Sequence, residues 1–135
     1  MPILSVFFIR TSLVYLGLGF TYGALLLANK GVPFSSPIWG LLSGHIEFLL
    51  IGWIIQLVLG VAYWILPRFS HGPVRGNEAL PWLSYVLINA GIWMDLLSPL
   101  FHEIPWLPAL GKITQTAAGA LFLTHAWPRI KPVGK

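Results

Sequence analysis

The chain has 135 residues, of which 56% are hydrophobic and only 9% are charged, and its formal net charge is +4. Because soluble domains carry roughly a quarter charged residues, this composition indicates a protein surrounded mainly by lipid. The absence of cysteine excludes disulfides, thiolate metal sites, iron–sulfur clusters and covalent c-type haem attachment.

Four apolar stretches have the length of about 20 residues that a helix needs to cross a bilayer. We place these spans near residues 4–29, 38–66, 82–100 and 106–127, with breaks rich in Gly and Pro between them. The apolar runs are continuous, whereas the strands of a membrane barrel would alternate apolar and polar residues. The sequence therefore predicts one all-α transmembrane domain over residues 1–135, an integral membrane four-helix bundle.

The positions of Lys and Arg predict the orientation of these spans. Most basic residues lie in the first turns of the first span, in the loop after the second span and in the C-terminal tail, whereas Lys30 alone lies outside a span on the opposite side. By the positive-inside rule, both termini are expected in the cytoplasm, in a multi-pass protein of the cell inner membrane. The first span lacks a basic leader, so we expect it to stay as a helix. Lipids are the expected surroundings, and nucleic acid is not an expected partner.

The second span carries the most distinctive polar residues. At about 100° per residue, Gly52, Gln56 and Tyr63 share one face of a helix with His45. Gly52 and Gly60 would let a large ring or another helix come close, and neutral imidazole is a common axial ligand of haem iron. Because an ionisable residue in a bilayer is costly, a functional role for His45 is the first hypothesis.

The runs HIEFLLIGW over residues 45–53 and GVAYWILPR over residues 60–68 carry a family resemblance. They resemble the helix of haem-copper oxidase and nitric oxide reductase catalytic subunits whose His binds the low-spin haem. The resemblance implies that His45 is an axial ligand of a b-type haem near the outer face of the membrane. Trp53 lies within the same span, where either contact with the cofactor or packing in the core would account for it.

The chain also departs from that family. The catalytic subunits have many more spans, a second low-spin ligand on a late helix and a histidine cluster for copper and high-spin haem. With four histidines here, the resemblance does not extend to the gas-reducing centre, and copper has no clear site. His102, in the loop after the third span, is a candidate second ligand; the alternative is an interfacial loop histidine. His71 and His125 are expected near lipid headgroups.

Three further charged residues fall within the expected spans. Glu47 projects from the face nearly opposite to His45 and needs a partner. Asp95 and Lys112 lie at similar depth on neighbouring spans, so Lys112 could pair with Asp95, with Glu47 or with a haem propionate. Because a small bundle does not easily enclose a whole helix, Glu47 favours a homodimer with the second span near its interface.

These observations favour a membrane b-type haem protein that transfers electrons, for example between quinol and an external electron-transfer partner. If the protein is an enzyme, we expect an oxidoreductase. One alternative is a non-redox accessory or assembly protein that keeps the oxidase-like helix as a packing element. Another is a small transporter or channel that uses Glu47, Asp95 and Lys112 as its polar path.

Overall fold

The fold is described from a computed structural model, which describes residues 1–101 and 103–130. Over these residues the chain consists of helices and loops without strands. The first rod is α1 (Ile3–Gly31), and the second is the continuous series η1 (Ser36–Gly40), α2 (Leu41–Glu47), η2 (Phe48–Ile55) and α3 (Gln56–Ile65). The third is α4 (Ala79–Leu97) with η3 (Ser98–Leu100), and the fourth is α5 (Leu107–Ala126) with η4 (Trp127–Arg129).

The four predicted spans coincide with these four rods to within three residues at each end. Three segments are long and apolar enough to cross a membrane: Ile3–Gly31, Ser36–Ile65 and Ala79–Leu100. α5 is not among them, because Lys112, Gln115 and several threonines lower its hydropathy. The all-helical prediction is confirmed for the described residues, whereas the crossing of a membrane by these helices, α5 included, stays a prediction.

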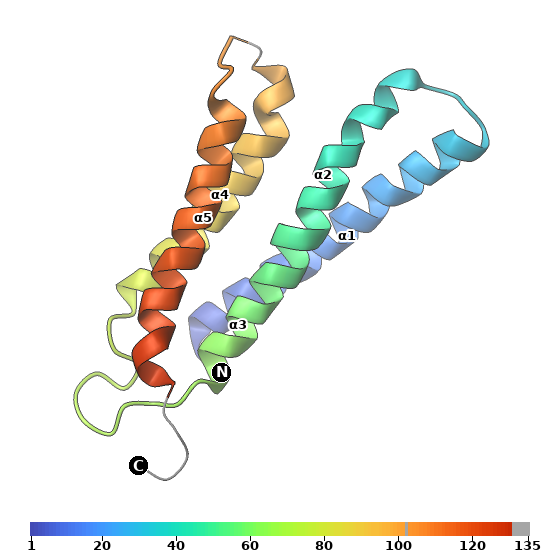
Figure 1. Cartoon of the computed structure of the whole chain (residues 1–135). Helices are drawn as coiled ribbons and strands as arrows, with labels where there is room; N and C mark the ends of the chain where they lie inside the picture. The colour runs from blue at the N-terminus through green and yellow to red at the C-terminus, as the bar shows by residue number, and fades with distance from the viewer. Residues whose placement is uncertain (102, 131–135) are drawn as a thin grey trace.

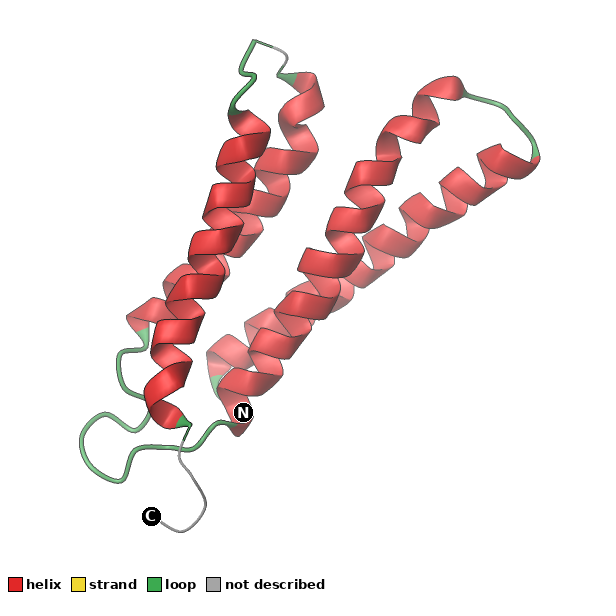
Figure 2. Ribbon diagram, in the orientation of Figure 1, coloured by secondary structure: helices red, strands yellow, loops and turns green. Residues whose placement is uncertain are grey.

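The rods form two antiparallel hairpins, as Figures 1 and 2 show. α1 crosses the α2–η2–α3 rod in one hairpin, and α4 lies along α5 in the other (Figure 1). The N-terminus, the 66–78 loop and the end of α5 lie at the same end of the molecule (Figure 1). We call this the loop end.

The hairpins pack through small residues and through a shared aromatic core. A Cβ atom added to Gly91 would lie 2.7 Å from the carbonyl oxygen of Gly111, so α4 and α5 approach at backbone distance. Between the hairpins, Phe8 of α1 packs edge-on against Tyr85 of α4 and Phe122 of α5. Close packing of this kind holds helices together in lipid, where apolar burial alone gives little driving force.

Polar contacts add to this packing at the middle of the molecule. The Thr11 and Tyr85 hydroxyl groups lie 2.8 Å apart, and the Tyr15 hydroxyl donates to the Asn89 side-chain oxygen at 2.9 Å. The Asn89 side chain thus links α4 to α1. Each such bond in a membrane protein contributes on average about 0.6 kcal/mol.

Candidate functional site

His45 lies in a niche that two glycines of α1 leave open. Its Nδ1 is 2.8 Å from the carbonyl oxygen of Gly19, and a Cβ atom on Gly23 would lie only 2.7 Å from its Cε1. Gly19 and Gly23 are four residues apart, so they share one face of α1. Because a carbonyl oxygen only accepts hydrogen bonds, Nδ1 carries the proton in the neutral ring. Nε2 then keeps its lone pair, and the ring is half-buried.

The rest of the predicted haem face is covered by α1. A Cβ atom on Gly52 would lie 2.6 Å from Cγ of Tyr15, and one on Gly60 would lie 2.7 Å from Cβ of Phe8. Of the two neighbours that the sequence allows at these glycines, a ring ligand or another helix, the structure places a helix. His45 thus has the donor chemistry of an axial ligand, but the Gly52 face does not leave room for a macrocycle within one chain.

The other residues expected at the cofactor are dispersed. Gln56 is fully buried, and its side-chain amide has no hydrogen-bond partner among the described residues. Tyr63 is also fully buried, but it lies at the loop end under two arginines. Trp53 is half-buried. Tyr63 follows His45 by 18 residues along the same rod, so the rise of the helix separates the two side chains.

On the side of the second rod that faces away from α1, Lys112 of α5 pairs with two carboxylates, one from the second rod and one from α4. Its Nζ lies 2.6 Å from Oε2 of Glu47 and 2.9 Å from Oδ2 of Asp95. The Gln115 amide donates to the second oxygen of Glu47. Of the three pairings that the sequence leaves open for Lys112, the structure shows the two ion pairs.

This cluster accounts for Glu47 within a single chain. The Glu47 side chain is 7% exposed, and its partners come from α5 of the same molecule. The inference of a homodimer from Glu47 therefore loses its basis, because the α4–α5 hairpin docks over that face. Glu47 gives no support for a second subunit.

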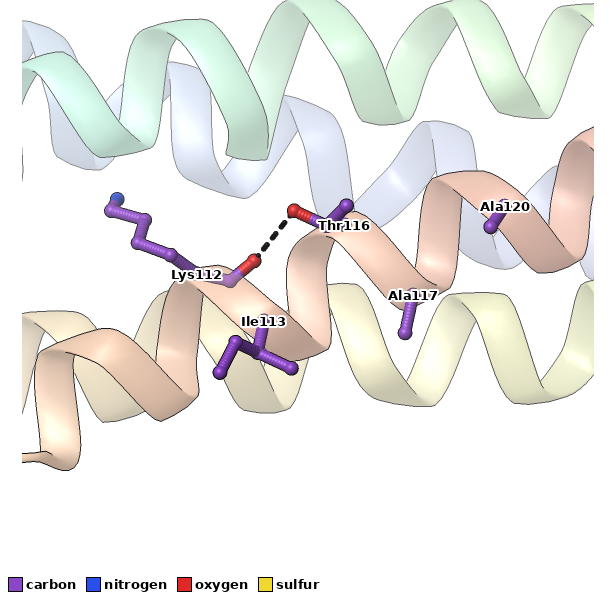
Figure 3. Close-up of a pocket in the computed structure, with 5 residues that line it drawn as sticks. All are labelled: Lys112, Ile113, Thr116, Ala117 and Ala120. Carbon is purple, nitrogen blue, oxygen red and sulfur yellow. Dashed lines mark hydrogen bonds between the residues drawn. The ribbon is translucent and has the colours of Figure 1, made fainter.

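The Lys112 side chain borders an open groove on the outside of α5. The groove has a volume of about 430 Å³ and is lined by Lys112, Ile113, Thr116, Ala117 and Ala120. Figure 3 shows Lys112 and Thr116 on one side of α5, with Ile113 and Ala117 on another. The ammonium group of Lys112 already pairs with two carboxylates, so it is a poor partner for a further anion such as a haem propionate.

The remaining histidines do not join His45. His102 lies outside the described residues. His71 is exposed in the 66–78 loop, and its expected position near lipid headgroups stays a prediction. His125 is 4% exposed, so it does not lie at a lipid-facing surface. No group of three or more His, Asp or Glu side chains with metal-binding geometry occurs in residues 1–101 and 103–130.

A second polar cluster at the loop end was not predicted. The Arg129 side chain is fully buried and donates to the carbonyl oxygens of Tyr63, Leu66 and Pro67 at 2.8–3.3 Å. Tyr63 lies in the last turn of the second rod, where carbonyls lack partners within the helix and carry the negative end of its dipole, and Leu66 and Pro67 follow directly after the rod. Burial, and then the nearby Arg75, lower the pKa of the Arg129 guanidinium from its ordinary value. The sequence shows Arg129 as one of several basic residues near the C-terminus and gives no sign that its side chain is buried.

Comparisons of the chain with protein-family models, with curated proteins and with solved structures find no match.

Proposed function

We propose that this chain is a membrane subunit for b-type haem, whose iron His45 would hold through Nε2. The observation that supports this most directly is the hydrogen bond between His45 Nδ1 and the Gly19 carbonyl. Histidines that bind metals through one nitrogen commonly donate the other N–H to a carbonyl or carboxylate, which fixes the tautomer and raises the basicity of the ligand. The resemblance of residues 45–68 to a haem-ligating helix supports the same role.

The function would be electron transfer. A bound b-type haem supplies one-electron chemistry, and the protein sets its potential through ligand identity and burial. His45 would hold the iron, while Gly19 and Gly23 would hold the imidazole in position. A quinol and an external electron-transfer partner remain our proposals for the donor and acceptor.

The cover of the haem would come from a second copy of the chain. Tyr15 closes the Gly52 face, and among the described residues His71 lies in the 66–78 loop and His125 lies against Asn77 of the same loop, away from His45. Symmetric pairs are the commonest oligomers of a single chain, and both copies of such a pair present the same surface to the interface. The proposed homodimer thus depends on the exposed side of His45 and no longer on Glu47.

An optical spectrum of the purified protein tests the haem assignment. We expect a sharp reduced-state α-band in the parent protein, its loss in His45→Ala, and its retention in His71→Ala, which removes an exposed loop histidine. Native mass spectrometry in mild detergent should show a dimer that retains haem. Equal haem content in His45→Ala and the parent protein would refute the ligand, and full haem in a monomer would refute the second copy.

A second candidate function, a non-redox accessory subunit, is favoured by the packing of the oxidase-like helix. Gly52 and Gly60 both serve the close approach of α1, and the conspicuous ion pairs join helices to one another. The same ion pairing makes Glu47, Asp95 and Lys112 a structural link more than a transport path. If the protein never acquires an α-band after haem supplementation, the accessory role becomes the better proposal.

A further inference from the structure

Two buried guanidinium groups meet at the loop end. Arg129 is fully buried and Arg75 is 8% exposed, and their Cζ atoms lie 5.5 and 5.3 Å from the centroid of the same ring, that of Tyr63. Arg75 comes from the 66–78 loop and Arg129 from η4, so the tertiary fold brings together two positive charges 54 residues apart in the sequence.

The hydrogen bonds of the two arginines differ. Arg129 donates to three carbonyl oxygens and to Nε2 of His125, so its donors are largely used within the protein. Arg75 donates through Nη1 to the Tyr63 carbonyl, its one hydrogen bond within the described residues. A guanidinium group has five N–H donors, so Arg75 keeps donors for a further acceptor.

The charges of this cluster are poorly balanced by the protein. Within residues 1–101 and 103–130, all ion pairs involve Lys112, so neither Arg75 nor Arg129 has a carboxylate within 4.0 Å. The carbonyl end of the second rod offsets only about half a charge. Glu78 also acts electrostatically on Arg129, but its side chain is exposed. His125 adds no charge, because Nδ1 donates to the Asn77 carbonyl while Nε2 accepts from Arg129.

A pocket lies against this cluster. It has a volume of about 250 Å³, and its lining includes the polar side chains of Arg75, Asn77, Thr124 and His125 together with the apolar side chains of Phe69 and Leu80. One water takes about 30 Å³ of liquid volume, so the pocket has room for a group with several oxygen atoms. Arg75 therefore provides a buried cation with unused donors at the wall of a cavity of suitable size.

We propose that this pocket binds a phosphate-type anion, either the phosphate of an anionic lipid headgroup or free phosphate. The loop end is the end that the Lys and Arg distribution places at the cytoplasmic surface of the membrane. Basic pockets between membrane helices on that side are suited to phosphate headgroups, and guanidinium groups match the geometry of phosphate oxygens. The site is independent of haem, and its lipid form requires that the helices lie in a membrane.

Lipid retention tests the first source of the phosphate. The purified protein is reconstituted in phosphatidylcholine vesicles containing phosphatidylglycerol, and the lipids it keeps are counted by native mass spectrometry. We expect the parent protein to retain phosphatidylglycerol over phosphatidylcholine, Arg75→Gln to lose that preference at least tenfold, and Arg68→Gln, at an exposed arginine of the same loop, to keep it.

Free phosphate is tested in lipid-depleted detergent. Inorganic phosphate should raise the unfolding temperature of the parent protein and of Arg68→Gln more than that of Arg75→Gln, with sulfate-free chloride buffer of equal ionic strength as the reference. A response in the lipid experiment alone identifies a headgroup site, and a response to inorganic phosphate alone identifies a free-anion site.

A pocket-filling variant covers the case in which Arg75→Gln does not fold. Thr124→Trp keeps Arg75 but fills the cavity from an exposed position of α5, and Thr116→Trp makes the same change on the same helix away from the pocket. Loss of binding in Thr124→Trp alone supports the site. The proposal is overturned if Thr124→Trp and Thr116→Trp bind equally, or if the parent protein responds in neither experiment.

Discussion

At the residue scale, the ion pairs of Lys112 are the clearest structural device. Glu47 and Asp95 belong to different hairpins, and the single ammonium group of Lys112 joins them. Without Lys112, two carboxylates would face each other across the interface with only Gln115 as a hydrogen-bond donor. The cluster then explains how a chain rich in apolar residues tolerates three charges at one depth.

We therefore predict that Lys112→Met destabilises the fold. Removing one partner of a buried ion pair costs about 3–5 kcal/mol, and we expect about 2 kcal/mol here because the Lys112 side chain is 53% exposed. The free energy of unfolding in mixed micelles, followed by circular dichroism, measures the loss. The double variant Glu47→Gln/Lys112→Met should recover part of it.

Lys30→Met is the matched control for this change, since Lys30 is an exposed lysine in the last turn of α1. Its effect should stay within about 0.5 kcal/mol. Equal stability of Lys112→Met and Lys30→Met would show that the Lys112 cluster contributes little.

At the element scale, the second rod is a packing surface on its α1 side. Gly52 and Gly60 admit Tyr15 and Phe8 of α1, and the close contacts include the Cβ atoms of these side chains, which move only with their backbone. A side chain at either position would therefore push α1 away from the rod. The glycines contribute to the fold through this contact.

Gly52→Ala should accordingly cost about 1–3 kcal/mol of unfolding free energy through overpacking. Gly17→Ala is the control, because a Cβ atom there meets nothing within 4 Å. Alanine is the better helix former, so that variant should gain up to about 1 kcal/mol. Thermal unfolding of the two variants gives the comparison. A Gly52→Ala protein of unchanged stability that loses haem would instead place the cofactor on the Gly52 face.

At the scale of the whole molecule, the hairpins dock at three levels. The Lys112 cluster joins them at one end, the Tyr15–Asn89 and Thr11–Tyr85 contacts in the middle, and Arg129 at the loop end. The docked arrangement returns α5 to the end from which α1 starts (Figure 1). If all four rods cross the membrane, α1 starts and α5 ends on the same side of it, as this arrangement requires. α5 is nevertheless less apolar than the other rods.

Single-cysteine labelling tests the crossing by α5, since the chain has no cysteine of its own. We expect Pro2→Cys, Ser70→Cys and Ile130→Cys to react with an impermeant maleimide only from the cytoplasmic side. Phe34→Cys and Glu103→Cys should react only from outside. Labelling of Pro2→Cys and Ile130→Cys from opposite sides would mean three crossings, with α5 outside the membrane.

The local features of this fold could be predicted from the sequence. The lengths of the apolar runs and the Gly and Pro residues between them predicted all four rods, because these signals act on neighbouring residues. The pattern also identified His45, Glu47, Asp95 and Lys112 as the residues that need partners in a low-dielectric environment. The identities of those partners stayed open, as the three alternatives for Lys112 illustrate.

The tertiary structure decided which faces meet. The rotation of each rod about its axis depends on contacts between segments that are distant in the sequence. α1 covers Gly52 and Gly60, the α4–α5 hairpin covers Glu47, and Arg129 reaches carbonyls more than 60 residues away in the sequence. Helix periodicity predicts on which side of its own helix a residue lies. Which residues lie against it depends on how a second helix packs there, because a contact requires two complementary surfaces.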